Sequence, residues 1–129
     1  MSTQFSGTGN LGAEPGLRTV TVDGEERQVC DMRIFFDRRK KDGDEYVDNG
    51  GFWVTASVWG WRADAAAKLL DKGVRVFAMG SLRTESWTGD DGEERSGLRL
   101  DVDYITVDLL GVEKITFSGR KKPASTSGA

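Results

Sequence analysis

The segment 52–59, Phe-Trp-Val-Thr-Ala-Ser-Val-Trp, constrains the fold more than any other part of the chain. It is dense in aromatic and β-branched residues, which favour a pleated, half-buried strand. Because side chains alternate between the two faces of a strand, Trp53 and Trp59 fall on the same face. The opposite face carries only aliphatic residues, namely Val54, Ala56 and Val58. We therefore expect this strand to bury its aliphatic side and to present two tryptophans outward; the alternative is that the tryptophans are core residues.

Much of the remaining chain also has the composition of β-strands. The segments are bounded by turn signals such as Asp23-Gly24 and Gly89-Asp90-Asp91-Gly92. The predicted strands cover residues 17–22, 29–36, 74–87 and 98–110. The polar, glycine-rich stretch 2–9 is predicted either to add an edge strand or to stay partly disordered. The polar segment 37–51 is predicted to be a long excursion from the sheet.

Residues 61–72 change to a helical period and form the only predicted helix. Small and aliphatic side chains recur at helical spacing, at Ala63, Ala66, Ala67, Leu69 and Leu70. Gly73 is predicted to end the helix, since glycine is common just beyond a helix C-terminus. Trp61, at the helix entrance, is assigned to packing rather than to binding.

The alternation of the segment 98–110 contains a slip. Its apolar residues are first Leu98, Leu100 and Val102, and then, on the other parity, Ile105, Val107 and Leu109. One extra residue near Asp103-Tyr104 would restore a single apolar face, so the sequence predicts a β-bulge there. Gly80, in the middle of its strand, is predicted to mark a bend.

Together these elements predict an all-β domain with one short α-helix. Five strands with the helix between the third and the fourth are typical of the five-stranded Greek-key barrel called the OB fold. We expect the domain to occupy residues 1–112. Residues 113–129 are expected to form a short, basic, flexible tail, in which Gly, Ser and Lys predominate.

The chain lacks histidine and has one cysteine, Cys30. These counts exclude an internal disulfide, a Ser-His or Cys-His nucleophile pair and an ordinary zinc site. Cys30 is predicted to be a small buried hydrophobe rather than a reactive thiol. Asp101 and Asp103 are assigned to solvent rather than to a divalent metal. We expect a protein that is not an enzyme and that carries no cofactor and no metal.

The charge is unevenly distributed along the chain. The net charge is −3, from 18 basic and 21 acidic residues, but residues 1–110 hold 14 of the basic and 20 of the acidic ones. A nucleic-acid surface on the domain must therefore be a local patch in an unfavourable overall field. No apolar run approaches the ~20 residues that span a bilayer, and no signal peptide opens the chain, so we expect a soluble, cytoplasmic protein.

Four blocks of sequence resemble the bacterial single-stranded DNA-binding proteins. They are residues 9–18, the pair Trp59-Gly60 before the alanine-rich helix, residues 70–76 and residues 80–87. Their order and spacing match over about residues 5–110. The resemblance implies an OB fold, usually a homotetramer, that protects single-stranded DNA during replication, recombination and repair, in the cytoplasm at the nucleoid.

The resemblance also implies which residues contact DNA. The stacking positions of the family fall on Trp53, Trp59 and Trp87. A further aromatic of the family has no match, and the basic run there consists of Arg38, Arg39, Lys40 and Lys41. That run either contacts phosphates or is neutralised by the acidic residues that follow it. Apart from the resemblance, Arg83 and Arg75, on the strand leading to Trp87, are further candidates for phosphate contact, and Arg18 and Arg33 are weaker ones.

The C-terminal end departs from the family pattern. The family ends in an acidic, Phe-ended tip that recruits other proteins, whereas this chain ends in a short basic stretch around Arg120-Lys121-Lys122. Recruitment by that route is not expected; a phage, plasmid or paralogous member, or a shortened chain, fits this pattern. An OB-fold protein-interaction module with weak or no DNA binding is the alternative function, and a carboxylate-metal nuclease is a third, disfavoured one.

Overall fold

A computed structural model describes residues 3–118 of the protein, with the side chains of residues 38–42 and 46–49 excepted. Its elements in chain order are β1 (Thr3–Leu11), β2 (Gly16–Val22), β3 (Glu25–Asp42), β4 (Glu45–Trp59), α1 (Trp61–Leu69), β5 (Arg75–Thr88) and β6 (Glu94–Val107). No helix in residues 3–118 is long or apolar enough to cross a lipid bilayer.

Five of the strands close into a barrel. The sheet runs in the order β1-β5-β6-β4-β3-β2, and an additional pairing joins β1 to β3. The ring therefore consists of β1, β3, β4, β6 and β5, while β2 pairs only with β3, outside the ring. Only the β4–β6 pairing is parallel among the described strands. In chain order, α1 follows the third of these five strands, β4, and precedes the fourth, β5, which confirms the predicted OB-type architecture.

The N-terminal segment forms a strand from Thr3 on, as one of the two expectations held, but it lies within the ring rather than at an edge. β1 pairs with β5 over Thr3–Asn10 and with β3 over Gly9–Leu11. Gly9 and Asn10 take part in both pairings. A Cβ atom on Gly9 would overlap the carbonyl oxygen of Phe35, so glycine permits the close approach of β1 to β3 that closes the ring.

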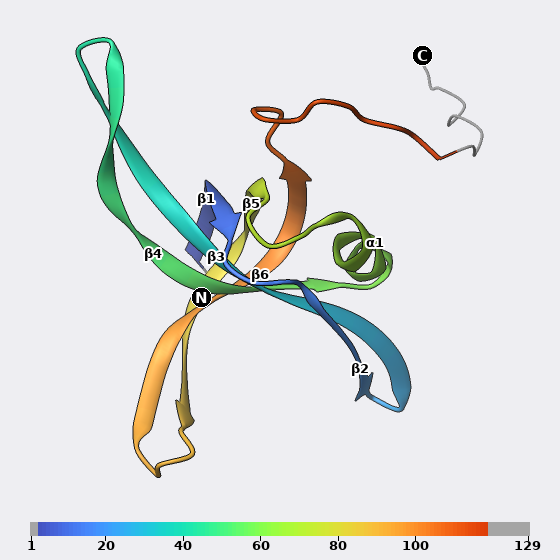
Figure 1. The fold of residues 1–129 in the computed structure, drawn as a ribbon. Helices are drawn as coiled ribbons and strands as arrows, with labels where there is room; N and C mark the ends of the chain where they lie inside the picture. Colours follow the sequence, from blue (N-terminus) through green and yellow to red (C-terminus); the bar gives the residue numbers. More distant parts are fainter. Residues whose placement is uncertain (1–2, 119–129) are drawn as a thin grey trace.

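The predicted excursion 37–51 is instead a two-stranded arm. β3 and β4 remain paired out to Asp42 and Glu45, with one irregularity between Asp37 and Arg39. Figure 1 shows this hairpin extending well beyond the barrel, and the β5–β6 hairpin extending in another direction. Strand pairing uses backbone hydrogen bonds, so a polar sequence can continue a two-stranded ribbon beyond the barrel.

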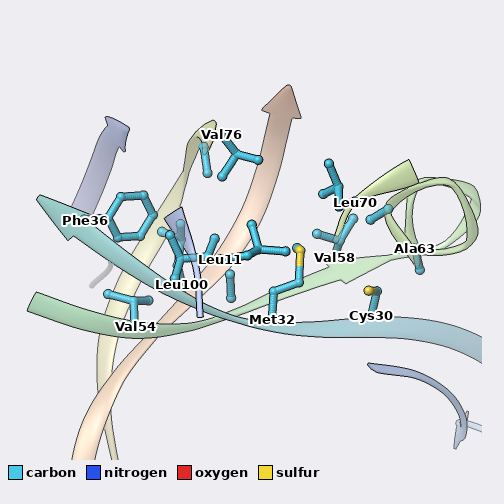
Figure 2. Packing of buried hydrophobic residues seen from close by; sticks show 14 residues of the cluster. Leu11, Cys30, Met32, Phe36, Val54, Val58, Ala63, Leu70, Val76 and Leu100 are labelled. Carbon is cyan, nitrogen blue, oxygen red and sulfur yellow. The ribbon is translucent and has the colours of Figure 1, made fainter. Parts of the chain in front are cut away.

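The barrel interior and one side of α1 share a single hydrophobic core (Figure 2). As expected, the aliphatic face of β4 is fully buried. The core residues of the barrel are Leu11, Cys30, Met32, Ile34, Phe36, Val54, Ala56, Val58, Val76, Ala78 and Leu100. The partners from the helical region are Ala63, Ala66 and Leu70.

The helix is shorter than predicted. α1 ends at Leu69, and Leu70 already has an extended backbone, although its N–H still donates to Ala66 O. Ala63, Ala66 and Leu70 lie at spacings of three and seven residues and are buried, whereas Leu69 falls outside this stripe and is 75% exposed. Gly73 does not end the helix; its N–H donates to Leu11 O as the chain turns towards β5.

The bulge predicted in the last strand is confirmed. Met79 pairs with Tyr104 but Gly80 pairs with Val102, so Asp103 is the extra residue of β6. Residues of both parities, including Val102 and Ile105, consequently pack against the core. A Cβ atom at Gly80 would overlap the carbonyl oxygen of Asp101, which is why glycine occupies the position opposite the bulge.

Candidate nucleic-acid interface

Trp53 and Trp59 lie on the outer face of β4. Their side chains are 46% and 43% exposed, while Val54, Ala56 and Val58 on the inner face are essentially inaccessible to solvent. The inner and outer faces of β4 therefore differ as the alternation of its side chains predicts. Two large aromatic surfaces remain available to a flat partner on the outside of the barrel.

Trp53 is held by two neighbours on β3. Its ring centroid lies 5.2 Å from that of Phe35, with the planes tilted by 57°. The Cζ atom of Arg33 lies 5.2 Å from the Trp53 centroid, within cation–π range. Arg33 Nη1 also donates to Thr55 Oγ1 at 3.1 Å. These contacts orient the ring while nearly half of its side chain stays exposed.

Trp59 and Trp87 lie in different surroundings. Trp59 borders a surface hollow that is lined also by Glu25, Glu26, Arg27, Gln28, Gly60 and Trp61. Trp87 is 48% exposed on the β5–β6 arm, where its ring lies close to Gly97. A Cβ atom at Gly97 would lie 3.3 Å from Trp87 Cη2, so the glycine leaves room for the ring.

A network of charged groups joins five strands beside these tryptophans; we call it the Asp31 network, and it consists of Arg18, Asp31, Ser57, Glu85 and Arg99. Arg18 Nε lies 2.6 Å from Asp31 Oδ2, and Ser57 Oγ donates to Asp31 Oδ1 at 2.8 Å. Arg99 Nη1 lies 3.5 Å from Asp31 Oδ1, and Arg99 Nε lies 3.0 Å from Glu85 Oε2. Arg99 Nη1 also donates to Ser57 Oγ.

The network lowers the pKa of Asp31. Partial burial by itself raises this pKa, but hydrogen bonds from Arg18 and Ser57 and the charges of Arg18 and Arg99 outweigh the effect of burial. Asp31 is therefore ionised at neutral pH, and it neutralises part of the positive charge on this surface.

Arg99 was missing from the sequence-based candidates. It lies between Leu98 and Leu100, and Leu100 is fully buried. The alternation of the segment 98–102 alone places Arg99 on the outer face, so this signal was present in the sequence. Its neighbours were not predictable in the same way, because they come from β3, β4 and β5.

Arg83 and Arg75, two further predicted cationic residues, lie in different surroundings. Arg83 is exposed on β5, and Asp101 holds it through a 2.9 Å contact that raises the pKa of the guanidinium. Arg75 is only 18% exposed; it contacts Asp37 through two nitrogens at 3.1 Å and also contacts Asn10 and Asp108. This geometry favours a role for Arg75 in the scaffold, and its contact with DNA stays a prediction.

The basic run of the β3–β4 arm lies outside the described side chains. The backbone of Arg38, Arg39, Lys40 and Lys41 belongs to β3, but the structure does not describe where these side chains lie. Their contact with phosphates, or their neutralisation by nearby acidic residues, stays a prediction. Of the predicted tail, residues 113–118 have no regular secondary structure, and the rest lies beyond the described residues.

Trp61 does not pack as predicted. Trp61 is 75% exposed. It makes a cation–π contact with the neighbouring Arg62, whose Cζ lies 4.9 Å from the ring centroid. The helix begins at Trp61, and its buried side is made by alanines, which leaves the first tryptophan on the outside. Trp61 therefore belongs to the protein surface, on α1 rather than on the outer face of β4.

Cys30 is fully buried, as predicted. Burial first, and then the charge of Asp31, raise the pKa of its thiol to about 11. Within residues 3–118, leaving aside the side chains not described, no cluster of three or more acidic, cysteine or histidine side chains is arranged to hold a metal ion.

Comparison with known families gives a match over most of the chain. The family model described as "Single-strand binding protein family" matches residues 3–110. A "Single-stranded DNA-binding protein" of Paenarthrobacter aurescens is 34% identical over 100 residues, which cover 75% of this chain and 56% of the relative. "Single-stranded DNA-binding protein 2" of Streptomyces coelicolor is 32% identical over 123 residues, which cover 93% of this chain and 56% of the relative. The chain thus spans about half the length of these relatives.

A solved structure has the same fold. The crystal structure of the small single-stranded DNA-binding protein from Streptomyces coelicolor superposes with a TM-score of 0.70 at 20% sequence identity. The match covers 85% of this chain and 97% of that one. At this identity the comparison establishes the barrel architecture and not the details of the surface.

Proposed function

The chain belongs to the single-strand binding protein family, and on that premise we propose that it binds single-stranded DNA without strong sequence preference. The family is one of non-enzymatic DNA-binding proteins, so the proposed role is binding and protection rather than a reaction. We extend the proposal to DNA replication, recombination and repair, and to assembly as a homotetramer, as the family resemblance implies.

The observation that carries the proposal is the division of β4 into a fully buried aliphatic face and an outer face with two half-exposed tryptophans. Every base has a flat π-surface, so stacking on an indole tolerates any sequence. We assign the stacking platforms to Trp53, Trp59 and Trp87. Arg33, which lies beside Trp53, and the arginines of neighbouring strands supply the cationic groups for the phosphates.

The test is a titration of the protein with oligo-dT, followed by intrinsic tryptophan fluorescence and by the anisotropy of a labelled oligonucleotide. We expect quenching with wild type, and for Trp53→Ala or Trp59→Ala a loss of affinity of about 5- to 100-fold, from roughly 1–3 kcal/mol per stacked base. Leu69→Ala is the control, because Leu69 is a large apolar residue that is 75% exposed on α1 and does not line the hollow beside Trp59.

Two outcomes would contradict the proposal. Affinity unchanged by both β4 substitutions would remove the stacking mechanism. No binding of oligo-dT by wild type, together with a stable complex with a longer paralogue, would select the protein-interaction module instead.

A further inference from the structure

Three arginines beside the proposed platforms are each held by carboxylates of the protein itself. Arg18 contacts Asp31, Arg99 contacts Asp31 and Glu85, and Arg83 contacts Asp101. These are the same donors that a phosphate would use, since guanidinium groups bind carboxylates and phosphates through equivalent hydrogen bonds. A DNA strand on this surface must therefore compete with the carboxylates of the protein.

Asp31 has the most central position among these carboxylates. In the β3–β4 register it lies opposite Ser57, which is two residues from Trp59 and four from Trp53 on the same outer face. On the other side of β4, Thr55 pairs with Arg99. A strand whose bases stack on both tryptophans passes over the middle of β4, where Asp31 and Arg99 meet.

We propose that Asp31 is a built-in competitor of the DNA phosphates, holding Arg18 and Arg99 in the free protein and yielding them to phosphate oxygens when DNA binds. The inference rests on the proposed function and concerns how strongly that surface binds. Exchange of a carboxylate for a phosphate partner leaves the number of arginine ion pairs unchanged, so these arginines add little net affinity. The remaining negative charge of Asp31 repels the backbone and further weakens the complex.

The experiment compares Asp31→Asn with Asp64→Asn in oligo-dT titrations at two salt concentrations. Asp64 forms an exposed ion pair with Lys68 on α1, so its replacement makes the same change in charge away from the proposed interface. For Asp31→Asn we expect binding tighter by about 3- to 10-fold, within the range by which charge substitutions at interfaces act, and a steeper salt dependence. For Asp64→Asn we expect the wild-type values.

Two further variants distinguish release of the arginines from a structural effect of the asparagine in Asp31→Asn. Glu85→Gln frees Arg99 from its other carboxylate and should also tighten binding, although less than Asp31→Asn does. Arg18→Met in the Asp31→Asn background should remove part of the gain, because it deletes one of the released cations. Circular dichroism establishes that each variant is folded.

The outcomes separate this inference from the proposed function. Absence of oligo-dT binding by wild type overturns the proposed function and this inference with it. Binding by wild type with no gain in affinity in either Asp31→Asn or Glu85→Gln overturns this inference alone.

Discussion

The ring of Trp53 lies over Gly12. A Cβ atom placed on Gly12 would come within 2.5 Å of both Cη2 and Cζ3 of the indole. Gly12 directly follows β1, and its N–H donates to Arg33 O at 2.8 Å, so the chain beside the ring is tied to the strand that carries Arg33 and Phe35. The tryptophan is thus positioned by a segment that lies some forty residues away in the sequence.

Gly12→Ala is predicted to weaken DNA binding without unfolding the protein. The added methyl group must displace the Trp53 ring from its position between Arg33 and the exposed side, which removes part of one stacking contact. We expect oligo-dT affinity to fall by about 3- to 10-fold, a fraction of the roughly 1–3 kcal/mol of a stacked base. Fluorescence anisotropy of a labelled oligonucleotide measures this, and Gly16→Ala, which has no atom within 4 Å of the new methyl, is the control.

The salt dependence of DNA binding is predicted to be shallow. Residues 1–110 carry more acidic than basic groups, and Arg18, Arg83 and Arg99 are already paired with carboxylates. Few counterions are then released on binding, and we expect a slope of log K against log salt of about −1.4 to −2, which corresponds to about two or three phosphates of a single strand. A slope several times steeper, measured with oligo-dT between low and moderate salt, would show that unpaired cations dominate the affinity.

Gly80→Ala is predicted to destabilise the barrel. The new methyl group would collide with the backbone of Asp101 and Val102 at the β6 bulge, and backbone atoms of a closed ring have little room to move. We expect a loss of about 2–4 kcal/mol in the free energy of unfolding, typical of steric conflict at a special position. Urea unfolding followed by circular dichroism measures it, and equal stability of Gly80→Ala and Gly16→Ala would be inconsistent with the close approach.

Arg75→Met is predicted to cost stability more than DNA affinity. Arg75 links β5 to β3 through Asp37 and to the residue after β6 through Asp108, in a largely buried position. Removing one partner of a buried ion pair is strongly destabilising, and we expect about 2–4 kcal/mol. A variant with wild-type stability but markedly weaker, less salt-dependent oligo-dT binding would instead identify Arg75 as a phosphate contact.

Cys30 is predicted to make stability depend on alkaline pH. Its folded-state pKa is about 11, against an ordinary value of 9.0, so the folded protein holds the thiol proton more tightly than the unfolded chain does. The contribution of the protonated Cys30 thiol to the free energy of unfolding is therefore fully present below pH 9 and is lost as the pH rises towards 11. We expect the difference in unfolding free energy between wild type and Cys30→Ala to shrink over this interval, and a thiol reagent at pH 8 to modify Cys30 only in denaturant.

Local patterns predicted much of the fold. The alternation of 52–59 is a property of neighbouring residues, and it correctly placed Val54 in the core and Trp53 outside. The slip of parity near Asp103 likewise identified the bulge, because a bulge changes which residues share a face. Polarity was less informative: residues 37–51 are polar, but a paired ribbon outside the barrel and a polar loop have similar compositions.

The sequence by itself determined the two faces of β4, the bulge of β6 and the place of the helix between β4 and β5, since each depends on residues close together in the chain. Only the tertiary structure decided that Asp31 meets Arg99, that Asp37 holds Arg75 and that Gly12 lies under Trp53. The physical reason is ring closure: the β1–β3 pairing and the parallel β4–β6 pairing bring together residues that no local period relates. The outward tryptophans are thus a property of β4, whereas the charges that surround them are a property of the closed barrel.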